Sequence, residues 1–332
     1  MRLPRSGRRI ALAVGFAVAL VASGSAFALQ KPGRTIVRDG QVRLVALNQA
    51  SFAFMVARTT KDCDHVELWN TAMKGSWRFG KTGPCVDLGS TGTGISAVGV
   101  SGNRALWIRY TGGNTRDWQL MTATTTQKAP KQLRLVNQDV DLPTPFVIGD
   151  AAGGHGIPYA AGREVVLLGA NGAAIFKHSE PARIVEVASG NGPAGAVVAA
   201  LRETGQVVML KPDGSLAWTV GYQPGSVKAI ELAPAGLIVQ LAEEVQIRTP
   251  TGSSAVKLPA GAVMTDFSEG RILYTVSNEI HAFKISNSKD TLLLKSRSGA
   301  PAIVATADTH GLGWAQGTTV NFTCGGCLDY AT

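Results

Sequence analysis

The sequence predicts an all-β protein folded as a β-propeller, and two observations carry that prediction. After residue 28, short apolar or alternating runs rich in Val, Ile, Leu and Trp are separated by Gly, Asn, Asp, Ser and Pro, which is typical of strands joined by tight turns. In addition, one turn sequence recurs about every 40 residues, which is the length of a four-stranded propeller blade. Almost no segment shows the apolar period of an amphipathic helix.

The recurring turn is clearest in the middle of the chain. The segment 168–176 aligns without gaps on the segment 210–218, and in each a strand ends in Asn-Gly or Asp-Gly and resumes toward an aromatic residue. These dipeptides tolerate the positive φ that tight hairpins need. A looser copy lies at Thr251-Gly252. The spacing predicts one such turn in each blade.

These turns divide the chain into seven predicted blades. We expect them at residues 41–81, 93–135, 144–178, 183–221, 226–258, 262–295 and 301–328. The last unit is short of its outer strand, and we expect residues 34–38 to supply it. Pairing the two ends of the chain closes the ring and removes exposed sheet edges. Six or eight blades remain open, and a β-sandwich is the rival fold, although it does not explain the repeat.

The N-terminus has the features of a secretory signal. Four arginines precede an apolar run at 10–22, which is followed by Ala26-Phe27-Ala28. A basic region, a short apolar region and an A-x-A site predict cleavage before Leu29. We therefore expect a signal peptide at 1–28 and a single secreted or extracytoplasmic propeller domain at 29–332. The alternative is an uncleaved anchor, because the apolar segment is just long enough to span a bilayer.

Charge argues against a nucleic-acid partner. The full chain of 332 residues has a formal net charge of +9. The four arginines of the signal account for much of this excess, and the remaining 28 basic and 23 acidic residues give +5. No Lys/Arg run remains to form a basic patch. After cleavage we expect a monomer that is not stably inserted in a membrane. We expect a protein or glycan partner at the loop face, which is the face of the ring that carries the loops between blades.

Part of the sequence resembles a known group of propellers. The Asp-Gly turn and Trp at 213–218 resemble the repeats of quinoprotein-type and TolB-like propellers. The segments 63–69, 92–94 and 102–114 resemble secreted bacterial propeller proteins of an uncharacterised family. This more specific resemblance covers residues 41–125. It implies a fold and no assigned activity.

Four cysteines in an exported chain predict two disulfides. Three connectivities exist, of which Cys63–Cys85 with Cys324–Cys327 needs the least reach. The alternative for Cys324 and Cys327 is a redox-active dithiol. Such a pair gains its reactivity at a helix N-terminus, whereas this one lies in a terminal β-unit. A structural disulfide between Cys324 and Cys327 is therefore the preferred interpretation.

The catalytic strings found in well-known enzymes are missing or out of context. Residues 75–82 match the phosphate-binding G-x-x-x-x-G-K-T pattern, but the loop reads as a strand and Gly83-Pro84 prevents a helix from following. No H-E-x-x-H or G-x-S-x-G string occurs. The six Trp residues fall mostly inside predicted strands, where inter-blade packing explains them.

Four acids are the candidates for a ligand site on the loop face. A propeller brings the loops between blades to the same rim as the loops joining second to third strands. By the predicted blade limits, these loops supply Asp62, Asp64, Asp139 and Asp141. Carboxylates at one rim suit calcium or another polar ligand, so we weigh a calcium site against solvated loop acids. No other cofactor is expected.

The preferred functional prediction is a secreted, non-catalytic propeller that binds or scaffolds a protein, glycan or envelope component. The alternative is a propeller enzyme, either a quinone-dependent sugar dehydrogenase or a lyase or hydrolase, with its site on the loop face. Quinoprotein chemistry needs calcium ligands that converge on the ring axis, and we expect no acid to recur at an axial position. Fold alone does not decide between binding and catalysis.

Overall fold

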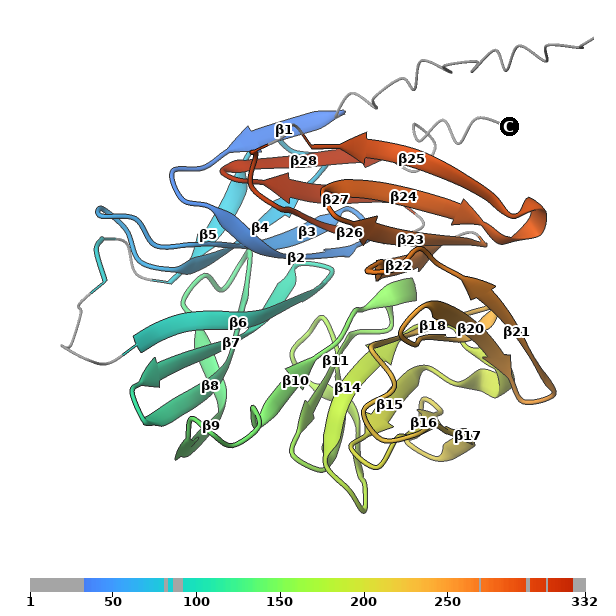
Figure 1. Ribbon diagram of the computed structural model, residues 1–332. Helices are drawn as coiled ribbons and strands as arrows, with labels where there is room; N and C mark the ends of the chain where they lie inside the picture. Colours follow the sequence, from blue (N-terminus) through green and yellow to red (C-terminus); the bar gives the residue numbers. More distant parts are fainter. Residues whose placement is uncertain are drawn as a thin grey trace, which may run out of the picture.

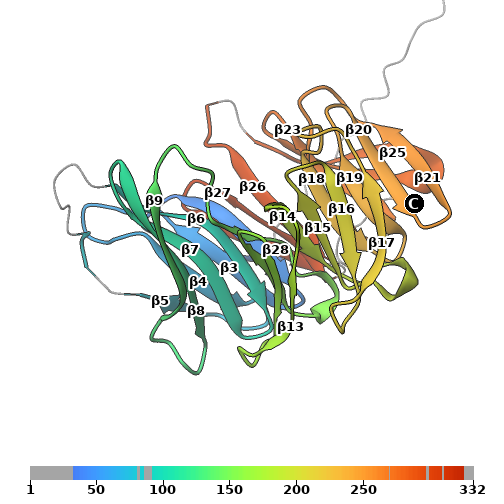
Figure 2. The ribbon, with the colours of Figure 1, turned by 90° about the horizontal axis from the view of Figure 1, so that it is seen from below.

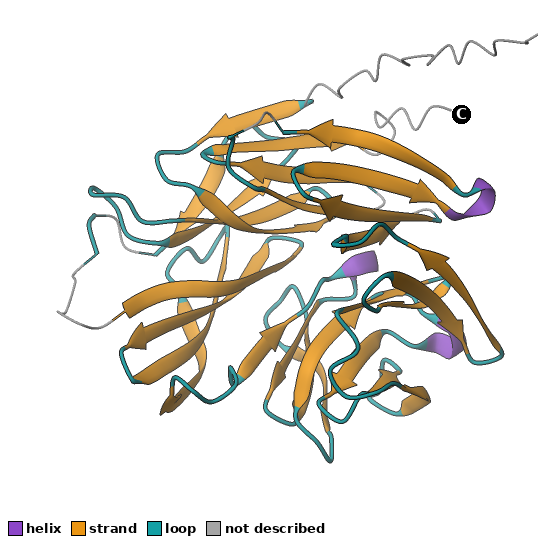
Figure 3. Cartoon of the chain, in the orientation of Figure 1, coloured by secondary structure: helices purple, strands orange, loops and turns teal. Residues whose placement is uncertain are grey.

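The structure is a closed ring of seven four-stranded antiparallel sheets (Figure 1). It is a computed structural model that describes residues 33–80, 83–85, 92–268, 270–296, 299–308 and 310–324. Within these residues the helical content is limited to three single turns of 3-10 helix (Figure 3). The predicted all-β propeller with seven blades is confirmed.

Six blades are simple meanders in chain order, the seventh takes its fourth strand from the start of the chain, and the first strand of each sheet named below is innermost. The first three blades contain β2 (Val42–Asn48), β3 (Ser51–Val56), β4 (His65–Asn70) and β5 (Ser76–Phe79); β6 (Gly92–Ser101), β7 (Arg104–Gly112), β8 (Thr115–Thr124) and β9 (Lys131–Asp139); and β10 (Phe146–Ile148), β11 (Ile157–Ala161), β12 (Glu164–Leu168) and β13 (Ala174–Ser179). The fourth and fifth contain β14 (Ile184–Ser189), β15 (Val198–Arg202), β16 (Gln206–Leu210) and β17 (Leu216–Gly221); and β18 (Ala229–Ala233), β19 (Gly236–Gln240), β20 (Glu244–Thr249) and β21 (Gly252–Lys257). The last two contain β22 (Val263–Ser268), β23 (Arg271–Val276), β24 (Glu279–Lys284) and β25 (Lys289–Lys295); and β26 (Ile303–Asp308), β27 (Gly311–Gln316), β28 (Thr319–Cys324) and β1 (Arg34–Val37).

The two ends of the chain close the ring, as predicted. Strand β1 pairs antiparallel with β28, with Arg34 opposite Phe322 and Val37 opposite Thr319. The first strand of every blade also contacts the first strands of both neighbouring blades, so that the seven inner strands surround a common axis. The blades lie side by side as twisted sheets (Figure 2).

The recurring turn lies between the third and fourth strands of a blade. In the third blade Leu168 pairs with Ala174, and in the fourth Leu210 pairs with Leu216, with a register shift at the same place in both. The glycine of this turn has a φ of 85° in the third blade, at Gly172, and of 79° in the fourth blade, at Gly214. The Asn-Gly and Asp-Gly dipeptides therefore fix the hairpin, because they tolerate the positive φ that the turn requires.

The hydrophobic core is divided into seven clusters, one at each junction between neighbouring blades. At the junction of the seventh and first blades, for example, Trp69 packs with Phe52 and Val320. Trp107 and Trp314 are buried in two other junctions. Inter-blade packing of these Trp residues is confirmed.

Several predictions fall at the edges of the described residues. The segment 76–79 within the phosphate-loop match is strand β5, as its composition indicated, whereas residues 81 and 82 are not described. The signal peptide at 1–28 and Cys327 lie outside the described residues and stay predictions. Within the part of the chain that is described, no helix is long and apolar enough to cross a membrane.

Candidate functional site

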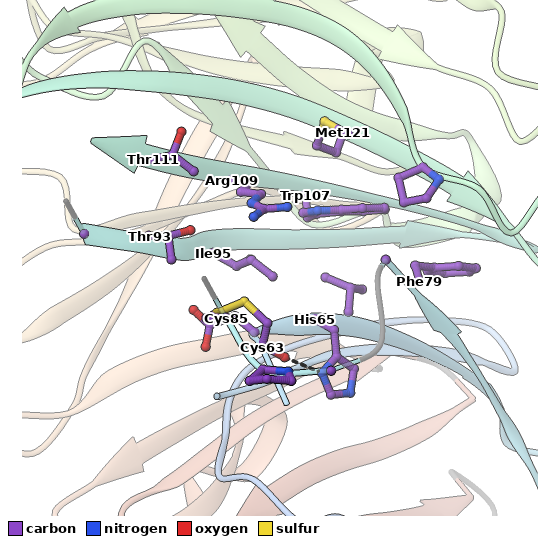
Figure 4. A pocket seen from close by; sticks show the side chains of 17 residues that line it. Cys63, His65, Phe79, Cys85, Thr93, Ile95, Trp107, Arg109, Thr111 and Met121 are labelled. Atoms are coloured by element: carbon purple, nitrogen blue, oxygen red, sulfur yellow. Dashed lines mark hydrogen bonds between the residues drawn. A yellow bond between two sulfur atoms is a disulfide. The ribbon is translucent and has the colours of Figure 1, made fainter. Parts of the chain in front are cut away.

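A cleft of about 480 Å³ lies between the first and second blades. One wall is formed by the beginning of β4 and by the disulfide between Cys63 and Cys85, and the opposite wall by β6, β7 and β8. Figure 4 shows the side chains of the two walls facing each other across this space. The cleft is large enough to take a small molecule or a short segment of a larger partner.

Strand alternation aims three side chains of the second blade into the cleft. Residues 107, 109 and 111 are spaced by two, so Trp107, Arg109 and Thr111 project from the same face of β7. Thr93 and Ile95 of β6 lie opposite Thr111 and Arg109 and line the same cleft. The wall is therefore apolar at Trp107 and Ile95 and polar toward Thr93 and Thr111.

The other face of β6 shows why a glycine precedes Ile95. A Cβ placed at Gly94 would lie 2.6 Å from the hydroxyl oxygen of Tyr110, because that side chain crosses the strand at this point. The guanidinium of Arg116 in turn lies 4.6 Å from the centre of the Tyr110 ring. Gly94 thus lets an aromatic and cationic stack support the wall from behind.

The floor of the cleft is continuous with the hydrophobic core. The indole of Trp107 is only 4% exposed and stacks on Phe79, with ring centres 6.0 Å apart and planes within 4°. Phe79 ends β5, so this stack joins the first blade to the second. Trp107 is therefore a core residue, as its predicted packing role implies, and only a small part of its surface lines the cleft.

Arg109 is the charged group of the cleft that is available to a ligand. Its side chain is exposed, and no described residue forms a hydrogen bond or an ion pair with it. By contrast, Asp64 on the opposite wall accepts a hydrogen bond from the backbone N–H of Arg58 at 2.6 Å. A guanidinium above an apolar floor favours a ligand that carries an anionic group next to an apolar one.

The wall of the first blade is held rigidly. The Cys63–Cys85 disulfide is confirmed, with the two Cα atoms 4.5 Å apart. The Asp62 carboxylate accepts hydrogen bonds from the N–H groups of Cys63 and Gly83, both at 3.1 Å, and pairs with Arg78. The hydrogen bond from Arg78 holds the pKa of Asp62 below its usual value. Asp62 is thus an anchor of the loop.

A buried carboxylate network continues behind this wall. Nδ1 of His65 is 2.9 Å from the carbonyl oxygen of Cys63, and Nε2 is 3.3 Å from the Glu67 carboxylate. The same carboxylate accepts hydrogen bonds from Arg38, at 2.8 Å, and from Ser76. Burial alone would raise the pKa of Glu67, but these donors hold it below its usual value. Arg38 follows β1, so the network also ties the ring-closing strand to the first blade.

The four acids predicted for a ligand site lie on loops of one face of the ring but have separate surroundings. Asp62 and Asp64 occupy the β3–β4 loop, Asp139 ends β9 and accepts a hydrogen bond from Thr115 at 3.2 Å, and Asp141 is exposed in the following loop. In the described part of the chain, no three His, Cys, Asp or Glu side chains form a group that could hold a metal ion. Calcium binding by these acids stays a prediction.

The expectation that no acid recurs at an axial position is wrong. Glu186, Glu231 and Asp266 occupy corresponding positions in β14, β18 and β22, the inner strands of three successive blades. The signal is present in the sequence as Glu-Val-Ala, Glu-Leu-Ala and Asp-Phe-Ser. Aligning inner strands in addition to turns would have found it.

Comparison with known proteins supports the fold alone. The sequence matches no protein-family profile, and no curated protein is detectably similar. A chain of the structure titled "Crystal Structure of Mitotic Checkpoint Complex" superposes with a TM-score of 0.55 at 13% identity, covering 96% of this chain and 98% of the other. Raptor from Chaetomium thermophilum has a TM-score of 0.52 at 12% identity over 87% of this chain, which is 28% of its own length. The Pan2 WD40 domain from Neurospora crassa has a TM-score of 0.51 at 9% identity, covering 88% of this chain and 95% of that domain. The chain is therefore a seven-blade β-propeller with WD40-like structural neighbours.

Proposed function

We propose that the protein is an exported, non-catalytic binding propeller that holds a partner protein through the cleft between its first two blades. The segment that enters the cleft carries a carboxylate beside an apolar side chain. Arg109 binds the carboxylate, and the surface formed by Trp107 and Ile95 contacts the apolar group.

The observation that carries this proposal is the unpaired state of Arg109 above an apolar floor. A guanidinium is a strong and geometrically selective carboxylate binder, because it presents several N–H donors in one plane. The guanidinium of Arg109 is available to a ligand, since no described residue pairs with it. The aromatic floor supplies contact area that is already ordered before binding.

The surroundings of His65 favour binding over turnover at this cleft. Both ring nitrogens lie against acceptors, the carbonyl oxygen of Cys63 and the Glu67 carboxylate. Both nitrogens are therefore engaged by groups of the protein itself, whereas a general base needs a ring nitrogen directed at the ligand. The enzymatic alternative would need a base from another element of the ring.

Separate observations support a protein partner and export. One of the structural neighbours is a chain of the mitotic checkpoint complex, and its likeness in fold to this ring supports a protein partner. Export is supported by the predicted signal at 1–28 and by the Cys63–Cys85 disulfide, which suits an oxidising compartment. Mass spectrometry of the mature protein should find Leu29 at its N-terminus, and retention of residues 1–28 would contradict cleavage.

Peptide display tests the proposed ligand. A library of random heptapeptides is selected against the wild-type protein, and the selected peptides are then measured against Arg109→Glu and Thr111→Trp. We expect peptides with Asp or Glu next to an apolar residue, and at least a tenfold loss of affinity in both variants. Arg163→Ala, an exposed arginine on the β11–β12 loop, is the matched control and should bind normally. Enriched peptides that bind Arg109→Glu equally well would contradict the proposal, and uronic acids that raise the melting temperature in place of peptides would make the ligand a glycan.

A further inference from the structure

Five acidic side chains lie close to the axis of the ring, one from each of five successive blades. They are Asp150 after β10, Glu186 in β14, Glu231 in β18, Asp266 in β22 and Asp308 at the end of β26. Four of them, all except Glu186, line a small axial cavity of about 10 Å³. That volume is about the size of one water molecule. Glu231 and Asp266 are buried, and the four acids that line the cavity lie close to one another.

Three of these acids also join neighbouring blades. The Glu186 carboxyl accepts a hydrogen bond from the N–H of Ile230 in the fifth blade at 2.8 Å. Glu231 accepts one from the N–H of Phe267 in the sixth blade at 2.9 Å. Asp308 accepts one from the N–H of Gln49 in the first blade. The acids thus belong to the junctions between inner strands.

Among the described residues, no Lys or Arg balances the charge of the axial cluster. None of the five acids forms an ion pair with a described Lys or Arg, and the basic group beside them is His310, whose Nδ1 is 3.7 Å from Asp308. The remaining charged neighbours are the acids themselves. Asp266 is 6% exposed, lines the cavity, and has a buried Oδ2 without a hydrogen-bond partner. The other oxygen, Oδ1, accepts a hydrogen bond from the backbone N–H of Phe267 at 2.6 Å, so a carboxylate at this position has one donor and one oxygen without any.

These surroundings favour the protonated form of the acids. Burial raises the pKa of Asp150 to about 6, and burial with the charge of Asp150 raises the pKa of Glu186 to about 8. Burial and the neighbouring acids raise the pKa of Glu231 and Asp266 well above their usual values. Burial also raises the pKa of Asp308, against the opposing effect of N–H donors and His310.

We propose that protons hold this axial cluster together, and that their loss at alkaline pH loosens the junctions between the fourth, fifth and sixth blades. A neutral carboxyl donates one hydrogen bond and accepts others, so the acids can bond to one another and still accept the backbone N–H groups. Ionisation removes the donors and places like charges side by side around a small cavity. The ring therefore contains a pH-sensitive lock at its axis.

The sign of the pH effect follows from linkage. The folded state binds these protons more tightly than the unfolded chain does. The contribution of the cluster to stability is therefore complete below about pH 4, where the acids are protonated in both states. It is lost as the pH rises through the raised pKa values of the folded protein, up to about 8 for Glu186.

Hydrogen exchange followed by mass spectrometry tests this lock on the intact protein. Exchange in segments 229–233 and 263–268 is compared at about pH 5 and about pH 9, corrected for the intrinsic pH dependence of amide exchange. We expect protection in these segments to fall at least tenfold at the higher pH, while segment 104–112 of the second blade keeps its protection. In a Glu231→Gln/Asp266→Asn variant, which keeps acceptor oxygens, the pH effect should be much reduced. Glu203→Gln, at an exposed ion pair, is the control and should behave as wild type.

Two results would overturn the proposal. Protection that does not change with pH in the wild type, or that changes equally in the double variant, would remove the axial acids from the effect. Recovery of protection at about pH 9 by millimolar CaCl2, MgCl2 or KCl, in the wild type but not in the double variant, would make the cluster a cation site. The wild-type pH series decides the matter even if the double variant does not fold.

Discussion

Glu67 in the first blade and Glu231 at the axis are both buried carboxyls, 6% and 8% exposed, yet the structure drives their pKa values in opposite directions. Glu67 is surrounded by the donors Arg38, Ser76 and His65. Glu231 is surrounded by other acids and accepts one backbone N–H. Burial is common to the two sites, so the neighbours decide which form of the carboxyl is stable.

The two sites therefore use a carboxyl in different ways. At Glu67 a negative charge joins the ring-closing segment to the first blade and supports the wall of the cleft. At the axis, neutral carboxyls join inner strands, and no described Lys or Arg pairs with them. The first site should weaken when the pH falls through the lowered pKa of Glu67, and the second when the pH rises.

The largest expected effect is the loss of the charge network in the first blade. Glu67→Ala leaves the partly buried Arg38 guanidinium without its partner, and breaking such a pair costs about 4 kcal/mol of unfolding free energy. Urea unfolding at neutral pH measures this loss. Glu203→Ala, which breaks the exposed pair with Arg183, is the control and should cost less than about 1 kcal/mol. Equal losses in the two variants would show that burial of the Glu67 network adds nothing.

Removal of the disulfide beside that network should have the next largest effect. Cys63→Ser opens a covalent link across a sequence separation of 22 residues, which the loop-entropy account values at roughly 3 kcal/mol. The melting temperature should fall under oxidising conditions, and the difference from wild type should disappear under reductant. Peptide mapping that joins Cys63 to Cys324 would contradict the assignment.

An axial substitution should have a smaller effect of opposite sign. Glu186→Gln keeps an oxygen to accept the Ile230 N–H but removes the group that must ionise in a buried site. We expect it to stabilise the protein by on the order of 2 kcal/mol above about pH 8 and to have little effect near pH 5. Urea unfolding at the two pH values provides the measurement. Destabilisation at the higher pH would mean that the ionised carboxylate is the stabilising form, as it is at Glu67.

Much of the fold could be predicted because its determinants are local. The Asn-Gly and Asp-Gly turns at Gly172 and Gly214 adopt the positive φ that the dipeptides imply, and they set the blade length. The need to cover the open edge of the last sheet then placed residues 34–38 against β28. The turns were predicted from residues that are neighbours in sequence. The pairing of the chain ends was predicted from the general need of a sheet to protect its edge strands.

The sites were harder to predict because they depend on the junctions between blades. Arg109 is an ordinary strand residue until the disulfide of the first blade forms the facing wall. Asp62 was predicted as a rim ligand, but its partner Arg78 lies on β5, 16 residues further along the chain, and no local pattern connects the two. The axial acids do recur in sequence, but their meaning depends on the convergence of inner strands on one axis.

Infrared spectroscopy of the protein in D2O near neutral pH measures the charge state of these carboxyls most directly. The account predicts a carbonyl stretching band of protonated carboxylic acids in the folded wild type, because burial and acidic neighbours raise the pKa of Glu186, Glu231 and Asp266. The band should lose most of its intensity in a Glu186→Gln/Glu231→Gln/Asp266→Asn variant and keep it in Glu67→Gln. A spectrum without that band, or a band that only Glu67→Gln removes, would contradict the claim that neighbours set opposite charge states at the two sites.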